Sequence, residues 1–171
     1  MTPHQAGFEA FAVSEPVERL FFALLPDAVV QLALAQTAAK LCGQSLRGRR
    51  IAPERYHVTL SYLGEHAGRR PQIEACAIEA AGSVRADAFT ATLDVGSSFC
   101  GRVEHPWVLR PTHVDHALHA LRNILSKALA TNGCARLDVS RFEPHLTIAY
   151  DEAALPPQPV EPIVWAVEEF A

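Results

Sequence analysis

Two short segments of this 171-residue chain share one pattern, and that repeat restricts the folds the chain can adopt. Residues 57–60 read HVTL and residues 145–148 read HLTI. Successive side chains of a β-strand point to opposite faces, so each histidine shares a face with its threonine and the two apolar residues share the other. We therefore predict two strands, each with an apolar face on a core and a polar face that presents one imidazole and one hydroxyl.

The elements around these segments repeat in the same order. In each half a strand, a helix, a connection and a His-bearing strand follow one another. Asp27 is a helix N-cap in the first half, and Thr112 with Asp115 forms a capping box in the second. Periodicity predicts strands at 18–25, 56–64, 89–95, 105–111, 142–150 and 163–170, and helices from Asp27 to Gly43, from about Pro71 through Val84, and from Thr112 to about Asn132. The segment 155–162, LPPQPVEP, is predicted to be a loop.

This order predicts an α+β fold in which residues 1–171 form a single bilobal domain with a pseudo-two-fold axis. Each lobe is expected to contribute one His-bearing strand to a central cleft. Residues 1–16 lack a basic region followed by an apolar one, so we expect a loose leader and no secretory signal.

Charge and composition exclude several classes of protein. A formal net charge of −4 argues against a protein that coats nucleic acid through a basic surface. No apolar run is long enough to span a membrane, so no membrane partner is expected. The four cysteines show no zinc-type spacing, and without an export signal we expect reduced thiols in a cytoplasmic protein.

The repeated polar face has the groups that a metal-free phosphodiester cleavage needs. His57 and His145 can act as a complementary pair, one accepting a proton and the other donating one. Thr59 and Thr147 can donate hydrogen bonds to phosphate oxygens. The sequence contains no acidic cluster with metal-ligand spacing, so the prediction includes no metal and no cofactor. A single His-x-Thr strand is usually an ordinary solvent face; the second copy supports a shared site.

The paired motifs, with RLFFA near the start and FEPHLTIAY near the end, resemble the 2H phosphoesterase superfamily. The branch they resemble is the bacterial RNA 2′,3′-cyclic phosphodiesterases, also called 2′-5′ RNA ligase-like proteins. The resemblance implies antiparallel sheets flanked by helices, a central cleft, and catalytic roles for His57, Thr59, His145 and Thr147. Members of this branch often have an arginine where this chain has Tyr150, and a phenol there can still bind substrate.

Other residues are weaker candidates for substrate contact. Alternation can turn one of Phe21 and Phe22 toward the cleft, and we select Phe22, although packing of both rings in the core is the favoured alternative. Arg50, in the basic loop at 47–50, could meet a phosphate, although a solvated loop is an equal alternative. Tyr62 is expected to pack on the apolar face of its strand.

Three histidines at three-residue steps, His113, His116 and His119, are expected to form an exposed polar helix face. They lack the one-turn spacing of a zinc pair. The same helix is expected to bury a stripe formed by Val114, Leu118, Leu121 and Leu125.

The expected activity is hydrolysis of 2′,3′-cyclic phosphodiesters at RNA or nucleotide ends to 2′-phosphomonoesters. A non-catalytic module that binds RNA ends, and 2′-5′ ligation at the same site, are the alternatives. We expect a monomer, because each chain contains its own cleft. The repeat leaves open which histidine is the base and which is the acid.

Overall fold

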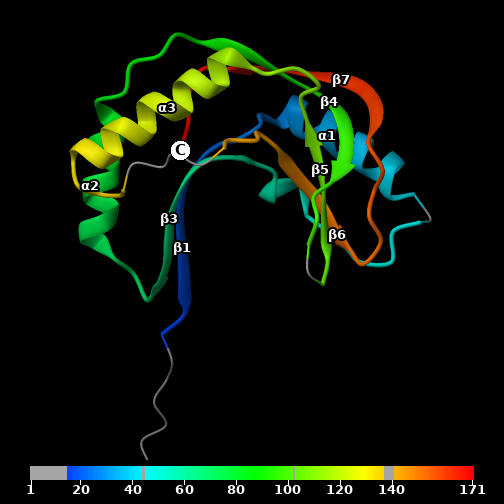
Figure 1. Ribbon diagram of the computed structural model, residues 1–171, viewed down its shortest axis with the longest axis horizontal. Coiled ribbons are helices and arrows are strands. Elements are labelled where there is room, and N and C mark those ends of the chain that lie inside the picture. Colours follow the sequence, from blue (N-terminus) through cyan, green and yellow to red (C-terminus); the bar gives the residue numbers. More distant parts are fainter. Residues whose placement is uncertain (1–14, 44, 102, 137–140) are drawn as a thin grey trace, which may run out of the picture.

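The computed structural model describes residues 15–43, 45–101, 103–136 and 141–171. One antiparallel sheet runs through the molecule in the strand order β1-β3-β6-β5-β4-β7, and β2 pairs with β6 off this path (Figure 1). The strands are β1 (Val17–Leu24), β2 (Arg49–Arg50), β3 (Val58–Ala67), β4 (Phe89–Ser98), β5 (His105–Arg110), β6 (Leu146–Asp151) and β7 (Gln158–Val167). The helices are α1 (Ala28–Cys42), α2 (Pro71–Gly82) and α3 (His116–Thr131), with a 3₁₀ turn η1 (Pro53–Arg55). The predicted α+β fold is confirmed.

The sheet consists of two parts that meet between the two His-bearing strands. β1 pairs with β3 along eight positions, and β6, β5, β4 and β7 pair in a second group. Between β3 and β6 the register gives one pair, Val58 with Leu146. Figure 1 shows the two groups of strands spreading apart from this junction. The two predicted lobes are therefore halves of one sheet, and the motifs lie at the line where the halves meet.

Two of the connecting helices, α1 and α3, pack on strands of the opposite half. α1 links β1 to β3, but it contacts β6 and β7. α3 links β5 to β6, but it contacts β3 and also α2. Figure 1 shows α2 and α3 on the side of β1 and β3, and α1 on the side of the other half of the sheet. The helix that follows the first strand of each repeat thus packs on the other half of the sheet. This packing joins both halves into one core.

Local sequence explains where α1 begins and ends. The Asp27 carboxylate accepts hydrogen bonds from the backbone N–H groups of Val29 and Val30, both at 2.8 Å. Gly43 ends the helix with φ 41°, a conformation that favours glycine. The buried residues of α1 include Val30, Leu34 and Ala38, as the helical spacing predicted.

α3 begins one turn later than its predicted cap. Asp115 is the N-cap and accepts from the Leu118 N–H at 2.9 Å, whereas the Thr112 hydroxyl bonds to Asp94. Val114 therefore precedes the helix and is 64% exposed, so its place in the buried stripe was wrong. The other three members of the stripe, Leu118, Leu121 and Leu125, are buried as predicted.

Two segments that were predicted to be loops pair as strands. β7 begins at Gln158, inside the proline-rich segment, because it is an edge strand where a proline needs no N–H partner. In the basic loop, Arg49 and Arg50 form β2 against Tyr150 and Ala149 of β6. Of the expected leader, residues 1–14 lie outside the described residues.

The expectation of four reduced cysteines was wrong. Cys76 of α2 and Cys134, just beyond α3, form a disulfide with their Cα atoms 5.8 Å apart. The two helices pack against each other, which brings these residues together across 58 positions of sequence. Cys42 is buried and Cys100 is exposed, and both are free thiols.

None of the helices in the described part of the chain is long and apolar enough to cross a membrane.

Candidate active site

The junction of the two half-sheets brings the four motif residues onto one face. The antiparallel pair Val58–Leu146 aligns His57 with Thr147 on one side of it and Thr59 with His145 on the other. All four motif side chains are half-buried. The alternate residues Val58, Leu60, Leu146 and Ile148 are at most 3% exposed in the core beneath. The sequence-predicted face of two imidazoles and two hydroxyls is therefore formed, with each histidine opposite the threonine of the other motif.

Both histidines are held by the same hydrogen bond. The Nδ1 atom of His57 lies 2.8 Å from the carbonyl oxygen of Arg55, and that of His145 lies 2.8 Å from the carbonyl oxygen of Glu143. A carbonyl only accepts, so Nδ1 carries the hydrogen and donates it in each case. In the neutral tautomer this leaves Nε2 as the atom with a free lone pair. Each ring can accept a proton at Nε2, or donate one from Nε2 when it is charged.

Each imidazole also lies against one phenylalanine. The ring of Phe21, from β1, stacks on His57 with centroids 5.0 Å apart. The ring of Phe99, which follows β4, meets His145 edge-on at 4.8 Å. The backbone hydrogen bond and the aromatic contact together restrict the orientation of each imidazole.

A β-bulge in each His-bearing strand changes which tyrosine faces the site. In β3 the bulge falls at Leu60, since Ala23 pairs with Thr59 but Phe22 pairs with Ser61. In β6 it falls at Ile148, since Val108 pairs with Thr147 but Trp107 pairs with Ala149. An extra residue reverses the alternation that follows it.

The tyrosine five residues after each histidine therefore lies on the histidine face. Tyr62 is 54% exposed and lines the cavity beside Thr59, so its predicted packing on the apolar face was wrong. Tyr150 is half-buried on the equivalent position of β6. The equal spacing of each tyrosine from its histidine was visible in the sequence, but strict alternation assigned both tyrosines to the wrong face.

A cavity of about 340 Å³ opens beside Thr59 and His145. Its remaining walls are formed by Leu60, Tyr62, Phe99, Arg122, Arg141, Phe142 and Glu143. The volume lies near the lower end of the range typical of small-molecule sites, roughly 300–1,000 Å³. His57 and Thr147 are not among its lining residues and lie on the other side of the Val58–Leu146 pair.

Two arginines near this cavity were not found from the sequence. Arg122 of α3 is 5% exposed, and its guanidinium carbon lies 5.6 Å from the centre of the Phe142 ring. Arg141 is exposed and forms an ion pair with Glu143 at 3.1 Å. The sequence pattern of α3 does not indicate a role for Arg122. Its position near the cavity results from the packing of α3 against β3.

The structure places Phe22 away from the histidines, which corrects that prediction, whereas substrate contact by Arg50 stays a prediction. Phe22 packs edge-on against Phe170 at 5.9 Å on the other face of β1. The Arg50 guanidinium reaches the Gly43 carbonyl at 3.5 Å, near Cys42. Burial raises the pKa of the Cys42 thiol, and the charge of Arg50 acts against that rise. Phe21 takes the position expected of Phe22, because the polar face of β1 carries Phe21 and not its neighbour.

Tyr150 lies beneath a cation supplied by the neighbouring strand. The guanidinium carbon of Arg49 lies 4.1 Å from the centre of the Tyr150 ring, and the two residues pair across β2 and β6. Arg49 is also 3.7 Å from the Glu104 carboxylate. A positive charge therefore lies beside this phenol, although the residue itself carries none.

The histidines at the start of α3 differ partly from their predicted exposed face. His113 and His116 are exposed. The ring of His119 is half-buried between the carbonyl oxygens of Asp115, at 2.7 Å, and Phe142, at 3.2 Å. Within the described residues, no group of three or more His, Cys, Asp or Glu side chains is placed to hold a metal ion.

Comparisons with known proteins agree with this architecture. A model of the 2′-5′ RNA ligase superfamily matches residues 26–171. The RNA 2′,3′-cyclic phosphodiesterase of Escherichia coli (strain K12) is 33% identical over 162 residues, which cover 92% of this chain and 86% of that protein.

Solved structures share the fold. E. coli LigT in its apo form has a TM-score of 0.71 at 29% identity, over 90% of this chain and 85% of LigT. E. coli LigT complexed with 3′-AMP has a TM-score of 0.70 at 28% identity, over 90% and 84% of the two chains. A family match across most of the sequence, together with this shared fold, establishes that the chain belongs to the 2′-5′ RNA ligase superfamily of 2H phosphoesterases.

Proposed function

We propose that this protein hydrolyses 2′,3′-cyclic phosphodiesters at the ends of RNA or nucleotides to 2′-phosphomonoesters, without a metal ion. The observation that carries the proposal is the matched pair of imidazoles. Each donates from Nδ1 to the carbonyl two residues earlier, so each has Nε2 available for proton transfer. The similarity to the E. coli cyclic phosphodiesterase supports the choice of substrate.

The proposed reaction uses the two histidines in opposite protonation states. One neutral Nε2 accepts a proton from water as the water oxygen attacks phosphorus. The other imidazolium donates its Nε2 proton to the ribose O3′ as the P–O3′ bond breaks. Each proton transfer is typically worth about 10²–10⁴ in rate. Thr59 and Thr147 donate hydrogen bonds to the non-bridging oxygens, where negative charge builds up.

The assignment of base and acid follows from how the substrate binds. Both rings have equivalent hydrogen bonds, so the histidine that faces the attacking water is the base and the one beside O3′ is the acid. With a ribose 5′-hydroxyl in place of water, the same steps open the cyclic phosphate to a 2′-5′ phosphodiester as the P–O3′ bond breaks and O3′ takes the proton, which is the ligation alternative.

Hydrolysis of cytidine 2′,3′-cyclic phosphate in the presence of EDTA tests the proposal. We expect a monoester product with EDTA present, and a loss of at least about 10²-fold in kcat for His57→Ala and for His145→Ala. Binding without turnover would instead support the non-catalytic module. Turnover that EDTA abolishes would contradict the metal-free mechanism.

The pH dependence supplies a second test. Because base and acid must hold opposite protonation states, kcat/KM is expected to follow a bell-shaped curve. A rate that does not change between about pH 5 and 8, where histidines usually titrate, would contradict the histidine pair.

A further inference from the structure

A second and larger cavity adjoins the candidate active site. It measures about 620 Å³ and lies between β4, β5, the start of α3 and the segment 141–144. Its walls include Phe99, Arg141, Phe142 and Glu143, which also line the 340 Å³ cavity beside His145. Since the two cavities share these walls, they lie next to each other, and the larger one is adjacent to the histidine site.

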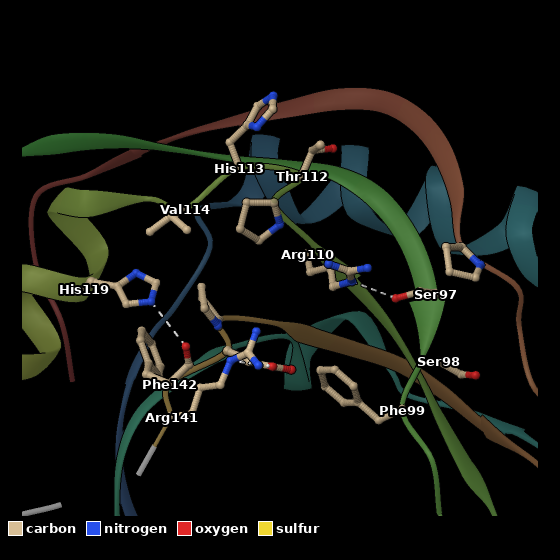
Figure 2. Close-up of a pocket in the computed structure, with 14 residues that line it drawn as sticks. Ser97, Ser98, Phe99, Arg110, Thr112, His113, Val114, His119, Arg141 and Phe142 are labelled. Atoms are coloured by element: carbon tan, nitrogen blue, oxygen red, sulfur yellow. Dashed lines mark hydrogen bonds and ion pairs between the residues drawn. The ribbon is translucent and has the colours of Figure 1, made fainter. Parts of the chain in front are cut away.

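Arg110 at the end of β5 gives this cavity a positioned positive charge. Its Nε donates to the Ser97 hydroxyl at 3.0 Å, and Ser97 itself is only 3% exposed on the neighbouring strand. Figure 2 shows this pair on the β4–β5 side of the cavity, opposite His119 of α3. In the described part of the chain no carboxylate lies within ion-pair distance of Arg110. Its two terminal nitrogens are available to an anion, and a guanidinium matches two phosphate oxygens at once.

The other walls suit a nucleoside. Phe99 presents an aromatic ring between the two cavities, and Pro144 and Pro157 add apolar surface. Aromatic side chains stack on the bases of single-stranded RNA with little preference for sequence. Arg141 adds a second cation, which is paired with Glu143.

The segment that separates the cavities is held in place from α3. The two ring nitrogens of His119 lie 2.7 Å from the carbonyl oxygen of Asp115, in the cap of α3, and 3.2 Å from that of Phe142, and a neutral ring donates to one of them at a time. A dashed line in Figure 2 marks the contact with Phe142. The shared wall is therefore anchored before substrate arrives, which lowers the entropy cost of binding.

We propose that the Arg110 cavity binds the nucleotide that precedes the cyclic end of an RNA strand, with Arg110 on the phosphodiester that links the last two nucleotides. This inference rests on the proposed function for the site of the cyclic phosphate. It assigns the substrate class as RNA of at least two nucleotides, with the cyclic end in the first cavity and the preceding nucleotide in the second.

Kinetics with two substrates of different length test the inference. The probes are cytidine 2′,3′-cyclic phosphate and the dinucleotide CpC that ends in a 2′,3′-cyclic phosphate. We expect the dinucleotide to have a kcat/KM about tenfold higher, mainly through KM, since a charge-assisted hydrogen bond is worth about this factor. In Arg110→Met that ratio is expected to fall to near one.

Controls separate a lost contact from a lost fold. Arg85→Met removes an equal charge from the loop after α2, where Arg85 donates to the carbonyls of Gly82 and Val84. It is expected to keep the tenfold ratio. Ser97→Ala removes the hydrogen bond that orients Arg110 and is expected to lower the ratio partway. Thermal melting of each variant verifies that the fold is retained.

The outcomes distinguish the two proposals. Turnover of both substrates with equal kcat/KM in the unmodified protein, or a ratio that survives Arg110→Met, overturns this inference alone. Absence of turnover with either substrate contradicts the proposed function. In that event, anisotropy of fluorescein-labelled CpCpC still decides the inference. Weaker binding by about tenfold in Arg110→Met supports the RNA site, and equal binding overturns it.

Discussion

Asp151 ends β6 as one of the most buried polar groups of the protein, at 1% exposure. Its carboxylate accepts from the backbone N–H groups of Arg47, Gly48 and Ala153 at 2.6–2.8 Å. A side chain at Gly48 would collide with the Tyr150 carbonyl, because its Cβ would lie 1.9 Å from that oxygen. Asp151 thereby fixes the loop that leads into β2 and places Arg49 over Tyr150.

The hydrogen bonds to Asp151 make this anchor dependent on pH. They hold the pKa of its carboxyl below the ordinary value, with the Ala153 N–H as the largest cause. A lowered pKa means that the stabilisation is complete above about pH 4, the pKa of an unfolded aspartate, and is lost as the pH falls through the folded pKa. We expect Asp151→Asn to lower the urea midpoint at pH 7, with a difference from the unmodified protein that shrinks below pH 4. A difference that is constant from pH 3 to 7 would contradict this account.

Tyr62 provides a test of the bulge in β3. Because its ring lies at the cavity, Tyr62→Ala is expected to lower kcat/KM for the cyclic mononucleotide by about three- to tenfold, the loss of one base-stacking or hydrogen-bonding contact. Unfolding free energy is expected to change by no more than about 0.5 kcal/mol, because the side chain is half-exposed. Val164→Ala, at a similarly exposed position on β7, is the matched control for general surface effects. Unchanged kinetics in Tyr62→Ala would show that the ring does not contact substrate.

Among the helices, α1 depends on a single capping side chain. Asp27 accepts from two N–H groups that otherwise have no partner within the helix. Asp27→Ala is expected to lower the free energy of unfolding by about 0.5–2 kcal/mol, measured by urea denaturation. Asp87→Ala in the exposed loop before β4 controls for the loss of one negative charge. Equal stability of the two variants would contradict the role of the cap.

The disulfide between Cys76 and Cys134 connects α2 to the end of α3. Such a bond stabilises mainly by restricting the unfolded chain, and about 2–4 kcal/mol is typical. We expect Cys134→Ser to lower the unfolding free energy by this amount under oxidising conditions. Dithiothreitol is expected to lower the stability of the unmodified protein similarly and to leave the variant unchanged. Cys100→Ser, which removes an exposed free thiol, is the control.

At the scale of the whole molecule, the exchange of helices joins both halves into one cooperative unit. α1 and α3 each pack on strands of the other half, so neither half-sheet buries its apolar face alone. The backbone of Ala171, after β7, also exchanges two hydrogen bonds with Ala23 of β1.

Denaturation by urea is therefore expected to show one transition. Trp107 and Trp165 both report on the half formed by β4 to β7, whereas far-UV circular dichroism reports on every helix and strand. Coincident midpoints of tryptophan fluorescence, circular dichroism and hydrolytic activity are expected. A fluorescence transition separated from the loss of activity would contradict a single unit.

The sequence by itself determined the elements that local chemistry specifies. Period-two alternation around His57 and His145, the Asp27 cap and Gly43 each act within a few residues, and the structure agrees with them. The repeated order also predicted the α+β fold, which the structure confirms, and a single site for both motifs, which stays a prediction.

Only the tertiary structure decided features that depend on contacts between distant segments. The bulges at Leu60 and Ile148 arise in the pairing of strands, and they reverse the faces of Tyr62 and Tyr150. The disulfide, the approach of Arg122 and the cavity around Arg110 depend on how helices pack across the two halves. A local sequence pattern indicates which side chains share one face of a strand. Contacts between side chains far apart in the sequence form only when the chain folds.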